Sequence, residues 1–106
     1  MVRQIRQAMP GVEIMLMTGA FGTVDPRGLT EWQSTVDPDG PSYRSCLMRL
    51  AMEEKCEFLD MEGAWGDYIR ATDKPISYFM RDVVHGNDRG RQPVARVLVE
   101  FFSPKQ

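Results

Sequence analysis

The sequence has few of the residues that build metal centres and disulfide frameworks. Its 106 residues include one histidine and two cysteines, Cys46 and Cys56. A structural zinc site needs four ligands of these kinds, so we do not expect one. If the chain between the cysteines is helical, a rise of ~1.5 Å per residue separates them by about 15 Å, whereas a disulfide needs Cα atoms within roughly 7 Å. We therefore predict two half-buried free thiols.

Long apolar runs and an excess of one charge are also missing. No run approaches the ~20 apolar residues that span a bilayer, and residues 1–8 lack the apolar stretch of a signal peptide. The 13 basic and 15 acidic residues give a net charge of −2, which supplies no basic surface for nucleic acid or an anionic membrane. We therefore predict no membrane span and no nucleic-acid partner, and the sequence leaves the localisation open.

The chain does have the composition of a globular protein, with 42% hydrophobic and 26% charged residues. Apolar residues at helical spacing predict helices over residues 2–9 and Tyr43–Lys55, with Ser42 as the cap of the second, and a weaker helix over Ala64–Ala71. A terminal helix is predicted with Pro93 in its first turn. Its apolar face consists of Val94, Val97, Leu98, Phe101 and Phe102.

Two short apolar segments predict strands. Val12–Thr18 is nearly continuous in apolar residues, which is typical of a parallel strand buried on both faces, and Glu57–Met61 is the second strand. The segment Gly19–Pro41 is rich in glycine, proline and aspartate and predicts a long loop, while Ile76–Met80 is apolar without an assignable period. The order helix–strand–helix–strand–helix predicts an α/β fold with parallel strands joined by right-handed connections.

The number of strands is too small for this architecture. Two strands cannot form a parallel sheet that is covered on both faces and has no open edge. The length of 106 residues allows a single domain. We therefore expect residues 1–106 to be one partial α/β domain, whose exposed strand edge is available for association.

One segment has the residues for acid–base chemistry. Asp82 precedes His85 by three residues in a loop ahead of the terminal helix. An aspartate can accept the Nδ1 proton of a histidine, fix its tautomer and leave Nε2 to take a proton from a serine. Asp88 also lies three residues from His85, but its place at the start of the helix favours capping, so Asp82 is the preferred partner. The bland alternative is a solvated loop histidine beside a helix capped by Asn87 or Asp88.

The segment from Asp82 to Gly90, followed by the amphipathic helix, resembles the closing D-x-x-H motif and last helix of the SGNH hydrolases, the GDSL-type esterases and lipases. Val12–Thr18 is similar to the family's penultimate core strand, and Tyr43–Cys56 with Glu57–Met61 to its last helix–strand unit. The resemblance implies a flavodoxin-like three-layer α/β/α fold, of which this chain is the C-terminal part. It also implies that His85 is the general base and Asp82 its orienting carboxylate, with no metal or organic cofactor and a small-molecule ester as substrate.

The sequence departs from the family where the nucleophile and the oxyanion hole should be. No Gly-Asp-Ser motif occurs, and no G-x-N-D motif precedes Val12–Thr18; Gly86 stands where the family often has proline. None of the serines has the glycine neighbours of a nucleophile elbow. They are Ser34, Ser42, Ser45, Ser77 and Ser103. We therefore expect the chain to supply the base and acid of a serine ester hydrolase but not its nucleophile, and to be inactive alone.

Two readings of the nearby aromatic residues and two readings of the whole chain stay open. Tyr78, Phe79 and Met80 either line an acyl pocket or, as we prefer, pack beneath the loop. Trp32 and Trp65 are weak candidates for stacking on a sugar ring. The alternative to a hydrolase of carbohydrate O-acetyl esters or short-chain acyl esters is a non-catalytic α/β interaction module or degenerate hydrolase remnant.

Overall fold

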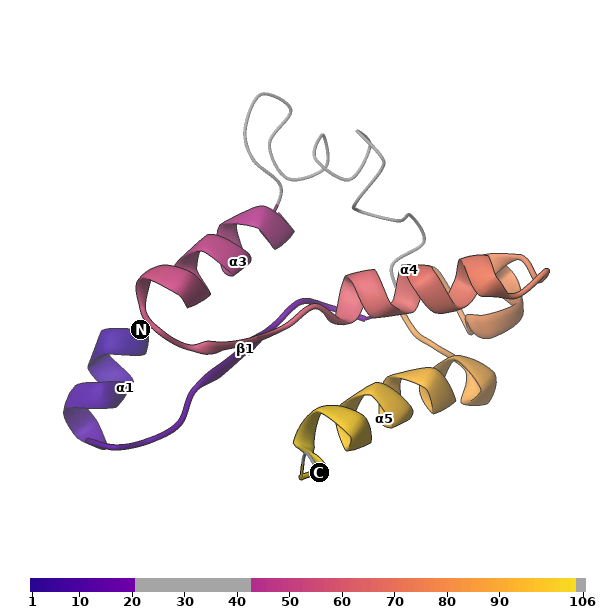
Figure 1. Ribbon diagram of the computed structural model, residues 1–106. Helices are drawn as coiled ribbons and strands as arrows, with labels where there is room; N and C mark the ends of the chain where they lie inside the picture. The colour runs from indigo at the N-terminus through magenta and orange to yellow at the C-terminus, as the bar shows by residue number, and fades with distance from the viewer. Residues whose placement is uncertain (21–42, 105–106) are drawn as a thin grey trace.

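The computed structural model of the chain describes residues 1–20 and 43–104, which form a mixed α/β structure (Figure 1). Strands run through the middle, with α1 and α3 at one end and α4 and α5 at the other. The elements in chain order are α1 (Val2–Ala8), β1 (Met15–Met17), α3 (Tyr43–Glu53), β2 (Glu57–Leu59), α4 (Met61–Ala71), the 3₁₀-helix η1 (Ile76–Phe79) and α5 (Asp88–Phe102).

Strands β1 and β2 pair in parallel, as predicted, with Leu16 opposite Phe58 in the register. Each strand is shorter than the apolar segment that predicted it. Backbone hydrogen bonds continue the pairing at both ends, from Glu57 N to Ile14 O (3.0 Å) and from Thr18 N to Leu59 O (3.2 Å). Helix α3, which connects the strands, packs against both of them. The described residues therefore contain one β–α–β unit.

The prediction that Val12–Thr18 is buried on both faces is wrong. Met17 is 41% exposed, and Met15 and Leu16 are half-buried. Two strands of three residues each cannot be covered on both faces by the few helices that the described chain provides. Strand β1 therefore has more apolar side chains than the described residues bury.

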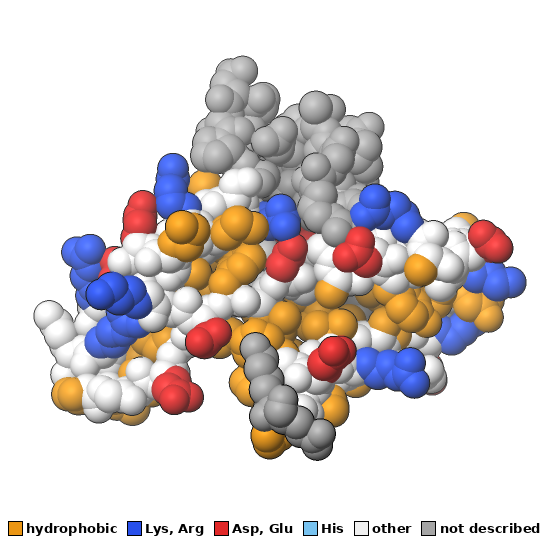
Figure 2. All heavy atoms as spheres, in the orientation of Figure 1, with side chains coloured by type: hydrophobic (Ala, Val, Ile, Leu, Met, Phe, Trp, Pro, Cys, Tyr) orange, Lys and Arg blue, Asp and Glu red, His pale blue; other side chains and the backbone are white. Residues whose placement is uncertain are grey.

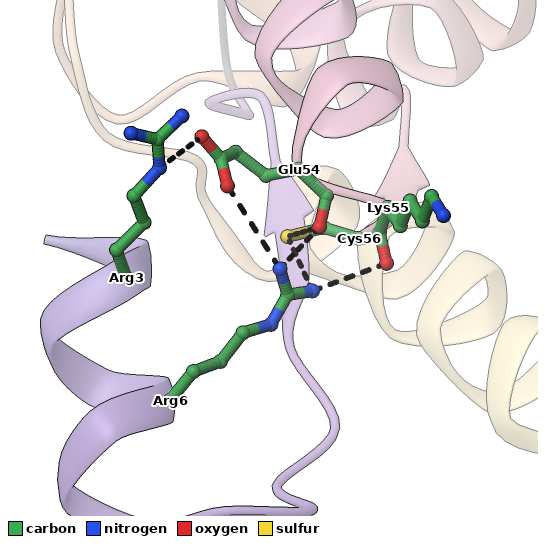
Figure 3. A network of polar contacts seen from close by, with 5 residues as sticks. All are labelled: Arg3, Arg6, Glu54, Lys55 and Cys56. Carbon is green, nitrogen blue, oxygen red and sulfur yellow. Dashed lines mark hydrogen bonds and ion pairs between the residues drawn. The ribbon is translucent and has the colours of Figure 1, made fainter.

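Helix α1 is attached to the end of α3 by arginine side chains (Figure 3). Arg6 donates to the carbonyl of Glu54 and, across 3.2 Å, to the carbonyl of Lys55. Arg3 donates to the Glu54 carboxylate at 3.0 Å. The carbonyls at the end of a helix have no partners within the helix and carry partial negative charge, so a guanidinium there satisfies both needs. These contacts connect segments that are far apart in the sequence.

The end of α3 has an unusual backbone at Lys55, whose φ is 55°. This left-handed conformation lets Cys56 N donate to Ala51 O at 2.8 Å and closes the helix in the manner of a Schellman motif. Glycine usually occupies such a position because a Cβ is strained there. The predicted helix over Tyr43–Lys55 therefore ends close to its expected limit. Its predicted cap, Ser42, lies outside the described residues, as does nearly all of the loop predicted over Gly19–Pro41.

Helix α4 begins before the predicted Ala64, because Asp60 caps it. The Asp60 side chain accepts from Gly63 N at 3.0 Å, so the helix starts at Met61. The Asp60 carboxylate also binds the Arg44 guanidinium through two hydrogen bonds, of 2.9 and 2.5 Å. One carboxylate therefore joins the first turn of α4 to α3.

Helix α5 begins at Asp88, the residue predicted at its start, but Pro93 lies further along the helix than predicted. Its cap is Asn87, whose side chain accepts from Gly90 N at 3.0 Å. The prediction of Pro93 in the first turn is therefore wrong, since the helix begins at Asp88 and Pro93 falls in its second turn. Pro93 is buried, and it has no N–H to donate to the carbonyl four residues earlier.

The principal core cluster lies between α4, η1 and α5. Trp65, Ile69 and Phe79 are buried there, with Ile76, Met80 and Val94 packed around them. The rings of Trp65 and Phe79 meet edge to face with centroids 6.2 Å apart. The apolar segment Ile76–Met80, which had no predicted structure, is therefore a 3₁₀-turn that delivers Phe79 to the core, and Trp65 is a core residue rather than a stacking platform.

The surface and the cysteines agree with the composition. Both cysteines are free and half-buried, as predicted. On the face shown in Figure 2, basic and acidic side chains are interspersed around the hydrophobic ones. Among residues 1–20 and 43–104, no helix combines the length and the apolar character needed to cross a bilayer.

Candidate functional site

The structure brings the two predicted site residues together. Asp82 and His85 lie in the loop between η1 and α5, and both carboxylate oxygens of Asp82 are 2.9 Å from Nδ1 of His85. An ionised carboxylate only accepts hydrogen bonds, so Nδ1 is the nitrogen that carries a proton. The neutral ring then presents the lone pair of Nε2 to any further partner.

The carboxylate of Asp82 is itself fixed by the backbone of the loop. Its Oδ1 accepts from the N–H of Val84 at 2.9 Å and from the N–H of His85 at 2.8 Å. The Val84 hydrogen bond, followed by the His85 side chain, lowers the pKa of Asp82 from its ordinary value of 3.8. Asp82 therefore stays ionised at neutral pH, the state that an orienting carboxylate needs.

The loop that carries this pair is closed at its base. An isolated antiparallel bridge joins Met80 to Gly86. The carbonyl of His85 accepts from the N–H of Arg81 at 2.8 Å. The side chains of Asp82 and His85 nevertheless remain 46% and 57% exposed. The pair is therefore held by local hydrogen bonds and is open to a reactant.

The rival carboxylate, Asp88, is placed differently. It begins α5, is 98% exposed and pairs with Arg91 at 3.6 Å. It also does not cap the helix, since that role belongs to Asn87. The geometry therefore favours Asp82 as the partner of His85, and the two alternatives for the cap are decided for Asn87.

A shallow hollow of about 350 Å³ lies beside the pair, with Asp82 in its wall. Its other lining residues are Ile76, Ser77, Met80, Arg81 and Val83. Of the aromatic segment considered from the sequence, Phe79 is buried in the core and Tyr78 stacks with Arg89, whose Cζ is 3.8 Å from the ring centroid. Packing beneath the loop therefore describes Phe79 and also Met80, which packs against the core cluster and in addition lines the hollow.

The serines divide between the described and the other residues. Ser34, Ser42 and Trp32 lie outside the described residues. Ser103 donates to Val99 O at 2.6 Å at the far end of α5, a helix length of about 22 Å from the His85 loop. Ser77 belongs to η1, which is not the strand-to-helix turn of a nucleophile elbow.

A second ionisable residue, Glu62, was missed by the sequence analysis. It lies just beyond the carboxyl end of β2, in the first turn of α4, and is only 5% exposed. Burial raises its pKa from 4.5 to about 7, and the neighbouring Asp60 carboxylate adds to the rise. Within the described residues its Oε2 has no hydrogen-bond partner. The available signal was its place after a strand, since ligands of open α/β sheets bind at the carboxyl ends of the strands.

The described residues do not gather three histidine, cysteine or carboxylate side chains as a metal site would require. Asp82 and His85 are a pair, in which the carboxylate of Asp82 binds Nδ1 of His85. The arrangement is suited to moving a proton at Nε2.

No family model, curated protein sequence or solved structure matches the chain. The function is therefore inferred from the geometry of Asp82 and His85 and from the parallel β–α–β unit.

Proposed function

We propose that this chain is the C-terminal part of a serine ester hydrolase of the SGNH type, in which His85 is the general base and Asp82 its orienting acid. The observation that carries the proposal is the contact of Nδ1 with both oxygens of Asp82 at 2.9 Å. The backbone hydrogen bonds to Oδ1 add that the carboxylate is held in place before any substrate arrives. A solvated loop histidine does not require this arrangement.

The chemistry follows from the free nitrogen of the ring. Nε2 takes the proton of a serine hydroxyl as its oxygen bonds to the ester carbonyl carbon, and Asp82 stabilises the imidazolium that forms. The imidazolium returns the proton to the departing alcohol as the ester C–O bond breaks, leaving an acyl-serine. Water then bonds to the acyl carbon as Nε2 takes its proton, and the imidazolium returns that proton to the serine oxygen as the acyl–serine bond breaks, which releases the acid and restores serine and histidine.

The serine and the oxyanion donors must come from outside the motifs of this sequence, which has no Gly-Asp-Ser. The parallel pair β1–β2 supports a larger sheet, since the described residues place no strand on the second edge of β1. We place the nucleophile-bearing strands of a three-layer α/β/α domain on that edge. The half-exposed Met17 is then an inner residue of the complete sheet.

The substrate is a small ester. The hollow beside Asp82 has three apolar side chains, Ile76, Met80 and Val83, and its volume of about 350 Å³ is large enough for a short acyl group. Carbohydrate O-acetyl esters and short-chain acyl esters both fit this description.

The test begins with the reading frame ahead of Met1. A Gly-Asp-Ser after a strand, followed by a G-x-N-D, supports the proposal, and the continuous protein should then hydrolyse p-nitrophenyl acetate and lose this activity in His85→Ala. The 106-residue chain alone should have negligible activity. Esterase activity of this chain that is lost in Ser77→Ala, or in any other single serine variant, would overturn the proposed division of the triad.

A second candidate function is a non-catalytic interaction module. The observation in its favour is the edge of β1 on which residues 1–20 and 43–104 place no strand; this edge carries the exposed Met17 and could accept a strand of another protein. An authentic full-length reading frame without either motif would favour this module over the hydrolase.

A further inference from the structure

Asn87 connects η1, the His85 loop and α5. Its Oδ1 accepts from Gly90 N at 3.0 Å and so caps α5. Its Nδ2 donates to the carbonyls of Tyr78 and Met80, at 3.0 and 3.4 Å. Its backbone N–H donates to the carbonyl of Phe79 at 3.0 Å. Asn87 therefore caps α5 and also binds the backbone carbonyls at the end of η1.

These contacts hold the two ends of the His85 loop, at Met80 and Gly86, close together. The loop begins at Met80, whose carbonyl Asn87 binds, and ends at Gly86, which pairs with Met80. Asp82 follows the start of the loop and His85 precedes its end. The separation between the Asp82 carboxylate and the His85 ring therefore depends on the closure that Asn87 makes.

Gly90 brings α5 close enough for this closure. A Cβ at Gly90 would lie 2.2 Å from the carbonyl oxygen of Phe79, which is backbone and cannot move aside as a flexible side chain can. The first turn of α5 therefore packs directly on the end of η1. Phe79, at this contact, is anchored in the core by Trp65 and Ile69. The contacts of Asn87 at the end of η1 therefore lie next to the buried core cluster.

We propose that Asn87 is a positioning residue for the Asp82–His85 pair: by joining η1 to α5 it holds Nδ1 of His85 against Asp82, so that Nε2 is the free nitrogen. Its relevance to ester hydrolysis rests on the proposed function, but its effect on the His85 ring belongs to this chain alone. A cap that served only α5 would use Oδ1 and would not need the donors on Nδ2.

The chain offers an unambiguous probe, because His85 is its only histidine. In the 106-residue protein labelled with ¹⁵N and held above the titration range of the imidazole, the ¹⁵N shifts give the ratio of the Nδ1–H to the Nε2–H tautomer. Asn87→Ser keeps a capping oxygen but cannot reach both carbonyls. We expect the ratio of the Nδ1–H to the Nε2–H tautomer to fall about tenfold. This is the effect expected when Nδ1–H of His85 loses its hydrogen bond to the charged carboxylate of Asp82.

The matched control is Asp60→Ser, which makes the same kind of change at the cap of α4 and also removes a partner in another element, Arg44. It should leave the tautomer ratio unchanged. Asn87→Asp is the second variant, since it keeps the cap acceptor and replaces the Nδ2 donors by an oxygen that faces the Tyr78 and Met80 carbonyls. We expect Asn87→Asp to lower the tautomer ratio. If far-ultraviolet circular dichroism shows that Asn87→Ser does not fold, Asn87→Asp alone provides the test.

An unchanged ratio in a folded Asn87 variant, or an equal fall in Asp60→Ser, would overturn the inference. Either result would leave the hydrolase proposal intact, because that proposal is tested by the upstream motifs and by the loss of esterase activity in His85→Ala. Conversely, a lowered tautomer ratio in a protein without an upstream Gly-Asp-Ser and G-x-N-D would support positioning by Asn87 and contradict the hydrolase proposal.

Discussion

Glu62 donates its backbone N–H to the hydroxyl oxygen of Thr18 across 2.9 Å. Thr18 is completely buried and follows β1, while Glu62 is 5% exposed and follows β2. The contact therefore joins the carboxyl ends of the two parallel strands. It also places an ionisable side chain in the interior, where its charged form is poorly solvated.

The first prediction concerns the pH dependence of stability. Folded Glu62 keeps its proton up to a pKa of about 7, whereas an unfolded chain releases it near 4.5. Between these values the folded state binds more protons, so the free energy of unfolding falls as the pH rises, by at most about 3 kcal/mol. Urea unfolding at intervals from pH 5 to pH 8 measures this fall.

Glu62→Gln is the matched variant for this measurement, because it has the same shape and no titration. The difference in unfolding free energy between the two proteins isolates Glu62, since all other groups titrate in both. We expect the unfolding free energy of Glu62→Gln to increase relative to that of the native protein as the pH rises. A difference that stays constant from pH 5 to pH 8 would contradict the raised pKa.

The second prediction separates Asp82 from Asp88 in a complete enzyme. Asp82→Asn keeps an oxygen for the N–H groups of Val84 and His85 but removes the charge that holds Nδ1. We expect kcat for p-nitrophenyl acetate to fall by about three to four orders of magnitude with little change in folding. Asp88→Ala, at an exposed side chain, should alter kcat less than twofold and stability by less than about 0.5 kcal/mol. The reverse pattern would refute the assignment.

The third prediction concerns the two arginines of α1. Arg6 binds the terminal carbonyls of α3, whereas Arg3 is 83% exposed and pairs with the carboxylate of Glu54, which is 15% exposed. Arg6→Ala should cost about 1–2 kcal/mol of unfolding free energy, because carbonyls at a helix end lose charged donors. Arg3→Ala should cost less than about 0.5 kcal/mol. Equal losses in thermal or urea unfolding would show that the carbonyl contacts add nothing.

The fourth prediction uses the left-handed backbone of Lys55, at φ 55°. Lys55→Gly should raise the free energy of unfolding by about 0.5–1 kcal/mol, since glycine relieves the Cβ strain and loses part of the gain to its greater freedom when unfolded. Lys55→Ala keeps the Cβ and should bring no such gain. A glycine variant no more stable than the alanine variant in urea would argue against the strain.

Much of the fold followed from local patterns in the sequence. Helical spacing of apolar residues predicted α1, α3 and α5, the nearly continuous apolar run Val12–Thr18 predicted β1, and the short segment Glu57–Met61 predicted β2. The Asp82–His85 contact was also predictable, because three residues of a loop bring a short carboxylate back to the ring. In each case the interacting residues are close in sequence or follow a simple period.

The features that were missed depend on contacts between distant segments or on a choice between similar residues. The burial of Glu62 requires Thr18, which a sequence pattern does not place beside it. Asn87 and Asp88 are both good caps, and the choice depends on which side chain can also reach η1. The early start of α4 depends on Asp60, which was assigned to a strand.

The bridge between Met80 and Gly86 has a consequence for how this sequence can vary. It makes the segment a ring of fixed circumference, in which Val83 and Val84 are 78% and 63% exposed. Val83 lines the proposed acyl hollow, so only the identity of Val84 is open to change, whereas the number of residues between Asp82 and His85 is fixed. An insertion or deletion there would separate the carboxylate from the ring even if every named side chain were kept.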